Sequence, residues 1–351
     1  QQLTMIFFID FTPFLVIYLK SMDFRVILFY IEMMIFFAAI QILYRIIYQN
    51  ASLLLLNNMC MLLSVGFIML CRLSLPSATK QLLIVAAGSA VSLVIPVMIR
   101  KMKFLKDLTW AYAGIGIVLL AAVLVLASTS YGAKLSLMGI QPSEVIKITF
   151  VFFMASLLCT KVDFRKVVLA TIVAVIHVGI LVLSRDLGSA VIFFVTYLVL
   201  IYVATRNPSY LFLGLGGGCV GSVIAYHLFG HAICLILVCT SFFLMIVTIA
   251  LKIRNPFYKL IALGLGTEYA FQVFLTIGGA TKFIPMTGVT LPLVSYGGSS
   301  VMCTILMLAI IQGLYILRED EDEQIETQRK ETIERRGKRA TPERKRNRQT
   351  P

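Results

Sequence analysis

Long apolar runs recur along this sequence, and each is close to the length that a helix needs to cross a lipid bilayer. A membrane helix requires roughly 20 predominantly apolar residues. The chain is 59% hydrophobic and only 14% charged, whereas about a quarter of the residues in a soluble domain are charged. We therefore expect an all-α, polytopic integral membrane bundle of about 10–12 transmembrane helices. The runs cover residues 4–19, 26–44, 52–71, 81–99, 108–128, 143–160, 167–184, 187–205, 209–229, 232–251, 258–279 and 297–317.

Basic residues gather in alternate connections between these runs. They follow the runs that end near residues 99, 160, 205 and 251, and a basic tail follows the last run. Cytoplasmic loops are enriched in Lys and Arg, so this pattern predicts that both termini are cytoplasmic. The same pattern accounts for the formal net charge of +14, so we expect no nucleic-acid partner.

The seven cysteines and three histidines are scattered through the apolar runs, without a CxxC pair. Cysteines placed in this way are interpreted as small apolar residues of the core. We therefore expect neither a disulfide framework nor a metal site held by protein ligands.

Charge and hydropathy divide the chain into three expected parts. Residues 1–50 form extra N-terminal transmembrane segments, residues 51–317 form the main membrane domain, and residues 318–351 form a charged cytoplasmic tail. The tail has an acidic block, Glu319 to Glu323, before a basic block, Arg335 to Arg348. This composition predicts disorder, with a helix near the membrane as the alternative. The basic end either contacts anionic membrane lipids or is simply solvated.

A segment rich in Gly, Pro and hydroxyl side chains, residues 285–300, lies between the last two runs. Pro285 and Pro292 each remove a backbone donor, which opposes a continuous helix. Irregular backbone at membrane depth is tolerated only where protein buries it or water reaches it. The segment therefore either lines a cavity at the mouth of the bundle or is an ordinary connection between helices. Its three glycines, Gly288, Gly297 and Gly298, permit turns with positive φ.

Two oppositely charged residues, Glu144 and Lys147, open the run at 143–160. They are three residues apart and share a helix face. Both would lie within the edge of the apolar slab, where an unpaired charge is costly. They form either a structural ion pair or a polar wall of a substrate cavity.

Further charged residues lie at the ends of, or within, other runs. Asp186 either caps a helix N-terminus or orients a partner or a cation, and Arg185 suits bidentate contact with a phosphate. Glu268, Gln272 and Thr276 share one face of a helix. A carboxylate within a membrane helix is a candidate for function, or else a hydrogen-bond partner between helices.

Together these motifs resemble the SEDS family of shape, elongation, division and sporulation proteins. Three motifs have the family's order and spacing: Gln141-Pro142-Ser143-Glu144, Asp186-Leu187-Gly188 and Ser295-Tyr296-Gly297-Gly298-Ser299-Ser300. The resemblance extends from about Leu53 to Leu317.

This resemblance implies a peptidoglycan glycosyltransferase of the bacterial cytoplasmic membrane that polymerises lipid II at the outer face, for cell elongation or division. It also implies a class B penicillin-binding protein transpeptidase as partner and a divalent cation, Mg²⁺ or Mn²⁺, as cofactor. Two other functions remain open. A lipid II flippase would need polar sites accessible from both faces, and a non-catalytic scaffold would need no active site.

The resemblance also implies roles for individual residues. Glu144 and Lys147 resemble the family's cavity residues, and Lys80-Gln81 resembles a pair at the outer start of a helix. Arg185 stands where many members have Pro, and Thr276 where many have Asn. The candidate catalytic residues are Glu144 and Asp186. The candidate substrate-binding residues are Lys80, Gln81, Lys147, Arg185, Ser295, Tyr296, Gly297, Gly298, Ser299 and Ser300.

One departure from the family concerns a long external loop that carries its catalytic aspartate. Here only Gly230 and His231 separate the two runs that flank this loop, and no aspartate occurs from Leu187 to Arg318. Two explanations are open. Either the sequence omits residues of a longer protein, or the loop is deleted and the chain alone is inactive in polymerisation.

Overall fold

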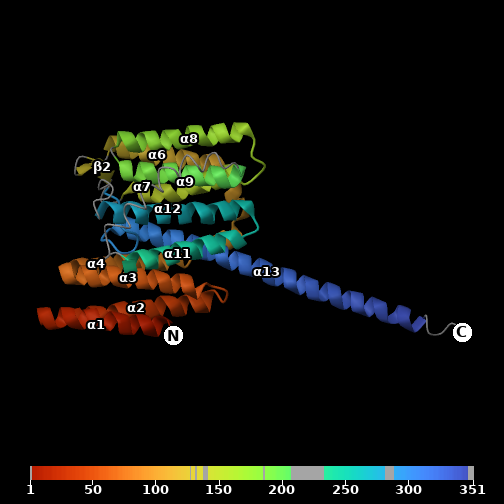
Figure 1. Ribbon diagram of the computed structural model, residues 1–351, viewed down its shortest axis with the longest axis horizontal. Coiled ribbons are helices and arrows are strands. Elements are labelled where there is room, and N and C mark those ends of the chain that lie inside the picture. Colours follow the sequence, from red (N-terminus) through yellow and green to blue (C-terminus); the bar gives the residue numbers. More distant parts are fainter. Residues whose placement is uncertain are drawn as a thin grey trace.

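Helices that run roughly side by side make up the protein, and one of them extends far beyond the others (Figure 1). The computed structural model describes residues 2–126, 128–130, 133–136, 141–184, 186–206, 233–280 and 288–346. The helices are α1 (Gln2–Ser21), α2 (Arg25–Ile47), α3 (Leu53–Leu73), α4 (Leu75–Ser92), α5 (Ile95–Lys101), α6 (Thr109–Leu126), α7 (Pro142–Leu158), α8 (Phe164–Leu183), α9 (Leu187–Thr205), α11 (Ile233–Lys252), α12 (Pro256–Ala280) and α13 (Gly298–Arg346). A 3₁₀ helix, η1 (Lys103–Asp107), joins α5 to α6, and a short antiparallel hairpin of β1 (Ser128–Ser130) and β2 (Ala133–Ser136) precedes α7.

The membrane character predicted from the sequence is confirmed. Among the described residues, seven spans are long and apolar enough to cross a membrane, and shorter apolar helices occur within α6 and α11. A helix satisfies its own backbone polar groups, which the bilayer core cannot do. The all-α, polytopic fold is therefore confirmed, with the small hairpin as an addition. The run predicted at 209–229 lies outside the described residues.

The run predicted at 81–99 contains a break. α4 ends at Ser92, and α5 starts at Ile95 with Pro96 in its first turn. Pro96 has no N–H for the carbonyl four residues earlier, which is that of Ser92. The Tyr44 hydroxyl on α2 donates a hydrogen bond to this carbonyl over 3.3 Å. The backbone group freed by the proline is thus satisfied by a neighbouring helix.

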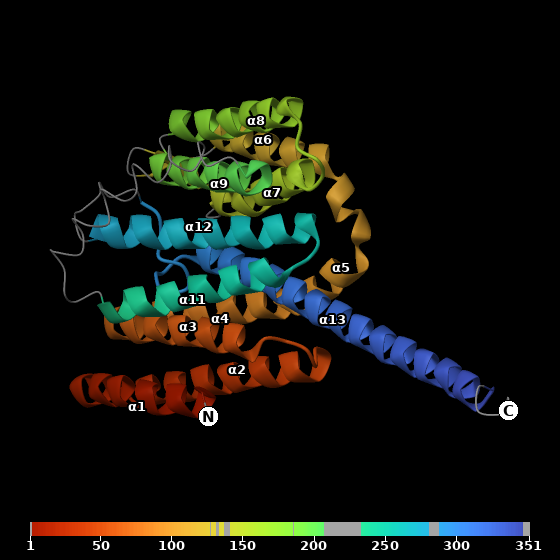
Figure 2. The same cartoon turned by 45° about the vertical axis from the view of Figure 1, so that its right-hand side comes forward.

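α12 and α13 form the centre of the bundle (Figure 2). Within their most apolar windows, 67% of α12 and 78% of α13 is buried, against 28% of the peripheral helix α8. α12 packs against α7, α9 and α11, while α13 packs against α4 and α5. Polar residues on α12 and α13 are therefore held deep in the protein.

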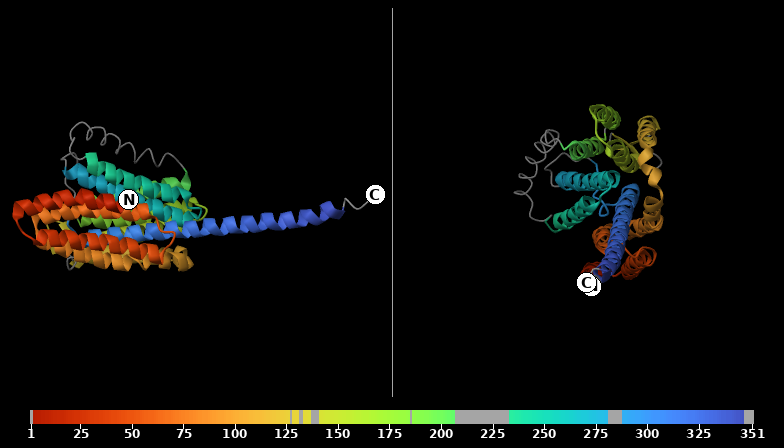
Figure 3. Two further views of the ribbon diagram at one scale, coloured as in Figure 1. Left: turned by 90° about the horizontal axis from the view of Figure 1, so that it is seen from below. Right: turned by 90° about the vertical axis from the view of Figure 1, so that its right-hand side faces the viewer.

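α13 continues through the charged tail and projects from the bundle as a single rod (Figure 3). In the part that the structure describes, the tail is helical to Arg346, which agrees with the helical alternative for this segment and extends it further along the tail. A helix already formed in the bundle can be extended without a new nucleation cost, and the tail is rich in the strong helix formers Glu, Lys, Arg and Gln. An ion pair of 2.8 Å between Glu326 and Lys330, four residues apart, supports this extension.

Candidate functional site

Polar residues from four parts of the chain meet at one end of the bundle. The parts are the first turns of α7, the C-terminal half of α12, the irregular segment 288–297 and the first turns of α13. We call this end the site end, and we call the opposite end, where α13 leaves the bundle, the tail end.

An ion pair buried within the protein lies at the start of α7. Glu144 Oε2 and Lys147 Nζ are 2.9 Å apart, and both side chains are 5% exposed. Pro142 suits the first turn of the helix, where the helix dipole also favours the Glu144 carboxylate. The ion pair expected between these residues is therefore present, and it lies on the wall of a small cavity.

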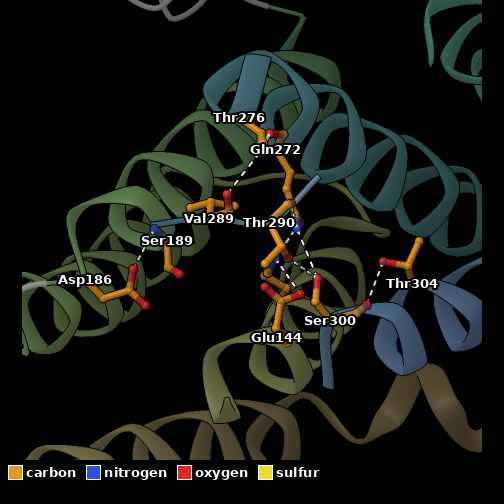
Figure 4. A network of polar contacts seen from close by, with 10 residues as sticks. Glu144, Asp186, Ser189, Gln272, Thr276, Val289, Thr290, Ser300 and Thr304 are labelled. Carbon is orange, nitrogen blue, oxygen red and sulfur yellow. Dashed lines mark hydrogen bonds and ion pairs between the residues drawn. The ribbon is translucent and has the colours of Figure 1, made fainter. Parts of the chain in front are cut away.

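Gln272 on α12 connects this ion pair to the irregular segment. Its Oε1 accepts a hydrogen bond of 2.6 Å from Lys147 Nζ. Its Nε2 donates to the carbonyl oxygen of Thr290 over 2.9 Å, and more weakly to Ser300 Oγ over 3.5 Å. Both the oxygen and the nitrogen of the Gln272 amide are hydrogen-bonded, and the Lys147 ammonium requires the oxygen on its side (Figure 4).

Hydroxyl groups complete the network at the site end. Thr290 Oγ1 donates to Ser300 Oγ over 2.6 Å, and Thr304 Oγ1 donates to the Ser300 carbonyl over 2.8 Å. Thr276 Oγ1 donates to the Gln272 carbonyl over 2.8 Å and lies 3.3 Å from the Val289 carbonyl. These contacts tie segment 288–297 to both α12 and α13.

Segment 288–297 is held against α3 at Gly66. A Cβ on Gly66 would lie only 2.7 Å from the Val294 carbonyl oxygen, so a side chain there would displace the backbone of the segment. Of the three glycines that permit positive φ in this segment, Gly288 adopts it, and the other left-handed residue of the segment is Leu293, with φ of 65°. Leu293 is 2% exposed, and its burial holds a conformation that leucine rarely adopts.

A cavity of about 20 Å³ lies between α7, α12 and α13, next to Glu144 and Lys147. One water molecule needs roughly 10–15 Å³, so the cavity is large enough for one. Glu268 lines it and is 2% exposed. Neither of its carboxylate oxygens has a hydrogen-bond partner within the described structure. A space of this size is too small for a saccharide.

Asp186 stays apart from this network. Its Oδ1 accepts a hydrogen bond of 3.0 Å from the backbone N–H of Ser189, and it is the N-cap of α9. Within the described structure, this hydrogen bond joins Asp186 to its own helix and does not reach the network (Figure 4). The cap interpretation is confirmed, and a second role for Asp186 stays a prediction. Arg185 lies outside the described residues.

The remaining predicted binding residues surround the site end at different depths. Lys80 is exposed, whereas Gln81 is buried and its Oε1 lacks a partner in the described structure. α4 reaches the start of α13, because a Cβ on Gly298 would lie 3.1 Å from Ile84 Cδ1. Within segment 288–297, Ser295 Oγ accepts a hydrogen bond of 3.1 Å from the Leu291 N–H. Ser300 is buried, Gly297, Gly298 and Ser299 are half-buried, and Tyr296 is 47% exposed.

The buried polar cluster does not fit a divalent cation. Within the described residues, no group of three or more His, Cys, Asp or Glu side chains could hold a metal ion. The Lys147 ammonium already supplies the positive charge between the Glu144 carboxylate and the Gln272 oxygen. The expectation that protein side chains form no metal site stays a prediction.

The sequence did not single out two members of the site, Thr304 and Cys303. Thr304 lies four residues after Ser300, on the same face of α13, and this spacing could have indicated it. Cys303 lines the cavity, and nothing in its local sequence distinguishes it from the other apolar cysteines.

Comparisons with known proteins agree with this fold. The family model for FtsW, RodA and SpoVE, described as "Cell cycle protein", matches residues 44–229 and 222–319. Peptidoglycan glycosyltransferase RodA of Mycobacterium tuberculosis is 26% identical over an alignment of 358 residues. The alignment covers 74% of this chain and 76% of the relative. A probable peptidoglycan glycosyltransferase FtsW of Aliivibrio salmonicida is 24% identical over 345 residues, covering 71% of this chain and 85% of the relative.

Solved structures share the fold. The crystal structure of the rod shape determining protein RodA of Thermus thermophilus matches with a TM-score of 0.66 and 22% identity, over 76% of this chain and 96% of that one. A chain from a structure describing coordination of polymerization and crosslinking by a peptidoglycan synthase complex matches with a TM-score of 0.65 and 20% identity, over 76% of this chain and 97% of that one.

The fold and the buried site therefore define a multi-pass membrane protein of the class that builds the bacterial cell wall. More specifically, the chain belongs to the family of FtsW, RodA and SpoVE cell cycle proteins. The mycobacterial alignment extends over more positions than the part of this chain that it covers. The alignment therefore includes positions of that relative without a counterpart in this chain.

Proposed function

We propose that this chain is a peptidoglycan glycosyltransferase that polymerises lipid II at the outer face of the bacterial cytoplasmic membrane, during cell elongation or division. Family membership and the names of the relatives support the activity. One structural observation carries the assignment of the site: a buried Lys147 ammonium, held by Glu144 and Gln272, lies beside a segment rich in hydroxyl groups.

The proposed reaction forms one bond and breaks another. The 4-hydroxyl of one disaccharide attacks the anomeric carbon of the growing chain, and a new glycosidic C–O bond forms. The C–O bond to undecaprenyl pyrophosphate breaks, the bonding electrons leave with the pyrophosphate, and the hydroxyl proton passes to a base. Catalysis of this step needs a base near the hydroxyl and positive charge near the pyrophosphate.

The geometry supports different roles for the two charged residues of α7. Lys147 supplies positive charge at the site end, with the exposed Lys80 as a second cation. Glu144 is already paired with Lys147 over 2.9 Å, so it positions the ammonium and is poorly placed to accept a proton. The hydroxyl groups of segment 288–300 and the exposed ring of Tyr296 are the groups suited to a saccharide.

We propose that Mg²⁺ or Mn²⁺ acts together with the pyrophosphate of the substrate. The buried cluster already contains an ammonium, so it offers no place for such an ion. Phosphate oxygens bind Mg²⁺ well, commonly with one or two carboxylates and several waters.

The proposed partner is a class B penicillin-binding protein, which cross-links the strands as this chain makes them. Support comes from the structural neighbour described as part of a complex that coordinates polymerization and crosslinking. In such a complex, the new strand would pass directly to the second enzyme.

Lipid II flippase activity is the alternative that shares the substrate. The described polar network lies at the site end, which favours a reaction at one face over transport between two. Proteoliposomes that contain fluorescent lipid II separate the two functions. Glycan strands without faster transbilayer movement support the polymerase, and faster movement without strands supports the flippase.

A non-catalytic scaffold is the alternative that follows from the absent aspartate loop. Peptide mapping of the expressed protein across Phe229-Gly230-His231-Ala232 distinguishes the two explanations. Additional peptides at this junction would restore the loop and support the polymerase. A contiguous peptide, together with full partner binding but no strand formation, would support the scaffold.

A further inference from the structure

A basic and aromatic surface lies at the tail end, where the connection between α5 and α6 crosses the bundle. Lys103, Phe104, Lys106 and Trp110 form this surface, which we call the tail-end patch. All four residues are exposed, with Phe104 at 51% and Trp110 at 65%. Aromatic and basic side chains together are typical of the membrane interface.

The backbone of the tail-end patch is fastened to the bundle, although its side chains point outward. The Ser156 hydroxyl at the end of α7 donates to the Lys106 carbonyl over 2.6 Å. The Tyr112 hydroxyl donates to the Leu105 carbonyl over 3.0 Å. The two lysines are thus presented from a fixed backbone, which lowers the entropic cost of binding a ligand.

The lysines of the patch are available for a ligand. Arg100, just before the patch, forms an ion pair of 2.7 Å with Asp320 on α13. For Lys103 and Lys106, by contrast, the described part of the chain supplies no ion-pair partner within 4.0 Å. The exposed Asp107 is the acidic neighbour of the patch, so its net charge is positive.

An apolar stripe runs from the patch along α6 toward the opposite end of the helix. Trp110, Gly114, Val118 and Val125 follow helical spacing, and each is exposed. Around Gly114, no heavy atom of the described residues lies within 4 Å of the position that a Cβ would take. The stripe therefore has a shallow gap between two larger side chains, and an alkyl chain fits such a gap.

We propose that the tail-end patch binds an anionic phospholipid, with the headgroup phosphate at Lys103 and Lys106 and an acyl chain along the α6 stripe. Charge complementarity selects an anionic headgroup, and continuity with an apolar membrane helix selects a lipid over a soluble anion. This site is separate from the basic end of the tail and independent of the proposed glycosyltransferase reaction.

The chain contains a single tryptophan, and it lies within the patch, so its fluorescence reports binding directly. Full-length protein is reconstituted into phosphatidylcholine vesicles. Increasing fractions of brominated phosphatidylglycerol, or of brominated phosphatidylcholine in a parallel series, are then included. Bromine quenches Trp110 where the labelled chain touches it. We expect quenching at equal mole fraction to be at least roughly twofold stronger with the anionic lipid.

Two matched variants make the result specific. Lys103→Gln with Lys106→Gln removes the proposed headgroup contacts, and we expect the preference for the anionic lipid to disappear. Lys252→Gln with Lys259→Gln removes two basic residues elsewhere at the tail end, and the preference should remain. Near-unchanged thermal unfolding in both variants shows that they are folded.

Three outcomes would overturn the proposal. These are equal quenching by the two lipids in the unaltered protein, a preference that survives Lys103→Gln with Lys106→Gln, and equal loss in both variants. Equal lipid quenching together with a shift of Trp110 emission by soluble polyglutamate would assign the patch to an acidic protein partner.

Discussion

α13 carries polar contacts at both ends, but the two ends differ in their surroundings. At the site end, Ser300 joins a network that includes the Glu144–Lys147 ion pair, whose side chains are 5% exposed. At the tail end, Asp320 pairs with Arg100, whose side chain is 44% exposed, and Asp322 pairs with Arg254, which is 60% exposed. The distances are similar, at 2.9, 2.7 and 3.0 Å, so the environment makes the difference.

Buried and exposed ion pairs therefore affect the stability of the protein differently. Exposed pairs contribute about 0–1 kcal/mol and weaken with salt. A buried pair adds little net stability, yet the loss of one partner leaves an uncompensated charge and costs about 3–5 kcal/mol. The site end is therefore sensitive to single substitutions, whereas the tail end fastens α13 through several weak contacts. Asn50 Nδ2 adds two of these, each 3.3 Å long, to Asp320 and Glu323.

The largest effect is expected for Lys147→Met. It leaves the Glu144 carboxylate buried without a countercharge, and we expect a loss of about 3–5 kcal/mol of stability together with the loss of polymerisation. Thermal unfolding in detergent measures the first effect. The double variant Glu144→Leu with Lys147→Met removes both charges and should recover most of the stability. A double variant as unstable as Lys147→Met would show that the unpaired Glu144 charge is not the cause of the loss.

A smaller effect is expected for Gly66→Ala on α3. Its Cβ would lie 2.7 Å from the Val294 carbonyl, so segment 288–297 must shift, at a cost of about 1–3 kcal/mol. Polymerisation should fall because the hydroxyl groups of the segment move. Gly179→Ala is the matched control, since no atom of the described part of the chain lies within 4 Å of a Cβ there. Equal stability and activity in the two variants would contradict the packing of the segment against α3.

A change of opposite sign is expected for Glu268→Gln. Both Glu268 oxygens are buried without a described partner, and removing the acidic group relieves the cost of burying a charge. We expect thermal stability in detergent to rise by about 1 kcal/mol. Clear destabilisation would indicate that Glu268 has a partner that compensates its charge.

The smallest effect is expected for Asp320→Asn at the tail end. It removes the exposed pair with Arg100, and we expect a loss of at most about 1 kcal/mol that disappears at high salt. Unfolding at low and high ionic strength measures it. A loss comparable to that of Lys147→Met would show that the two ends do not differ as the environment predicts.

Patterns within single helices allowed the fold and part of the candidate site to be predicted from the sequence. Apolar run length gave the polytopic helical fold, and the spacing of Glu144 and Lys147 gave their ion pair. Contacts between distant segments did not follow from such patterns. Gln272 meets Lys147 across 125 positions, and Gly66 accommodates a segment more than 200 positions later in the chain. The length of the tail helix could not be predicted, because the composition of the tail does not reveal that a buried helix precedes and nucleates it.

The central claim is that the chain polymerises lipid II at the site built around Lys147. The most direct measurement is glycan strand formation from lipid II by the full-length protein in complex with its transpeptidase partner. The unaltered protein is compared with the Glu144→Leu, Lys147→Met double variant, which should remain folded and bound to the partner. We expect glycan strands from the unaltered protein and none from the double variant. No strands from the unaltered protein, or strands at an equal rate from both, would contradict this claim.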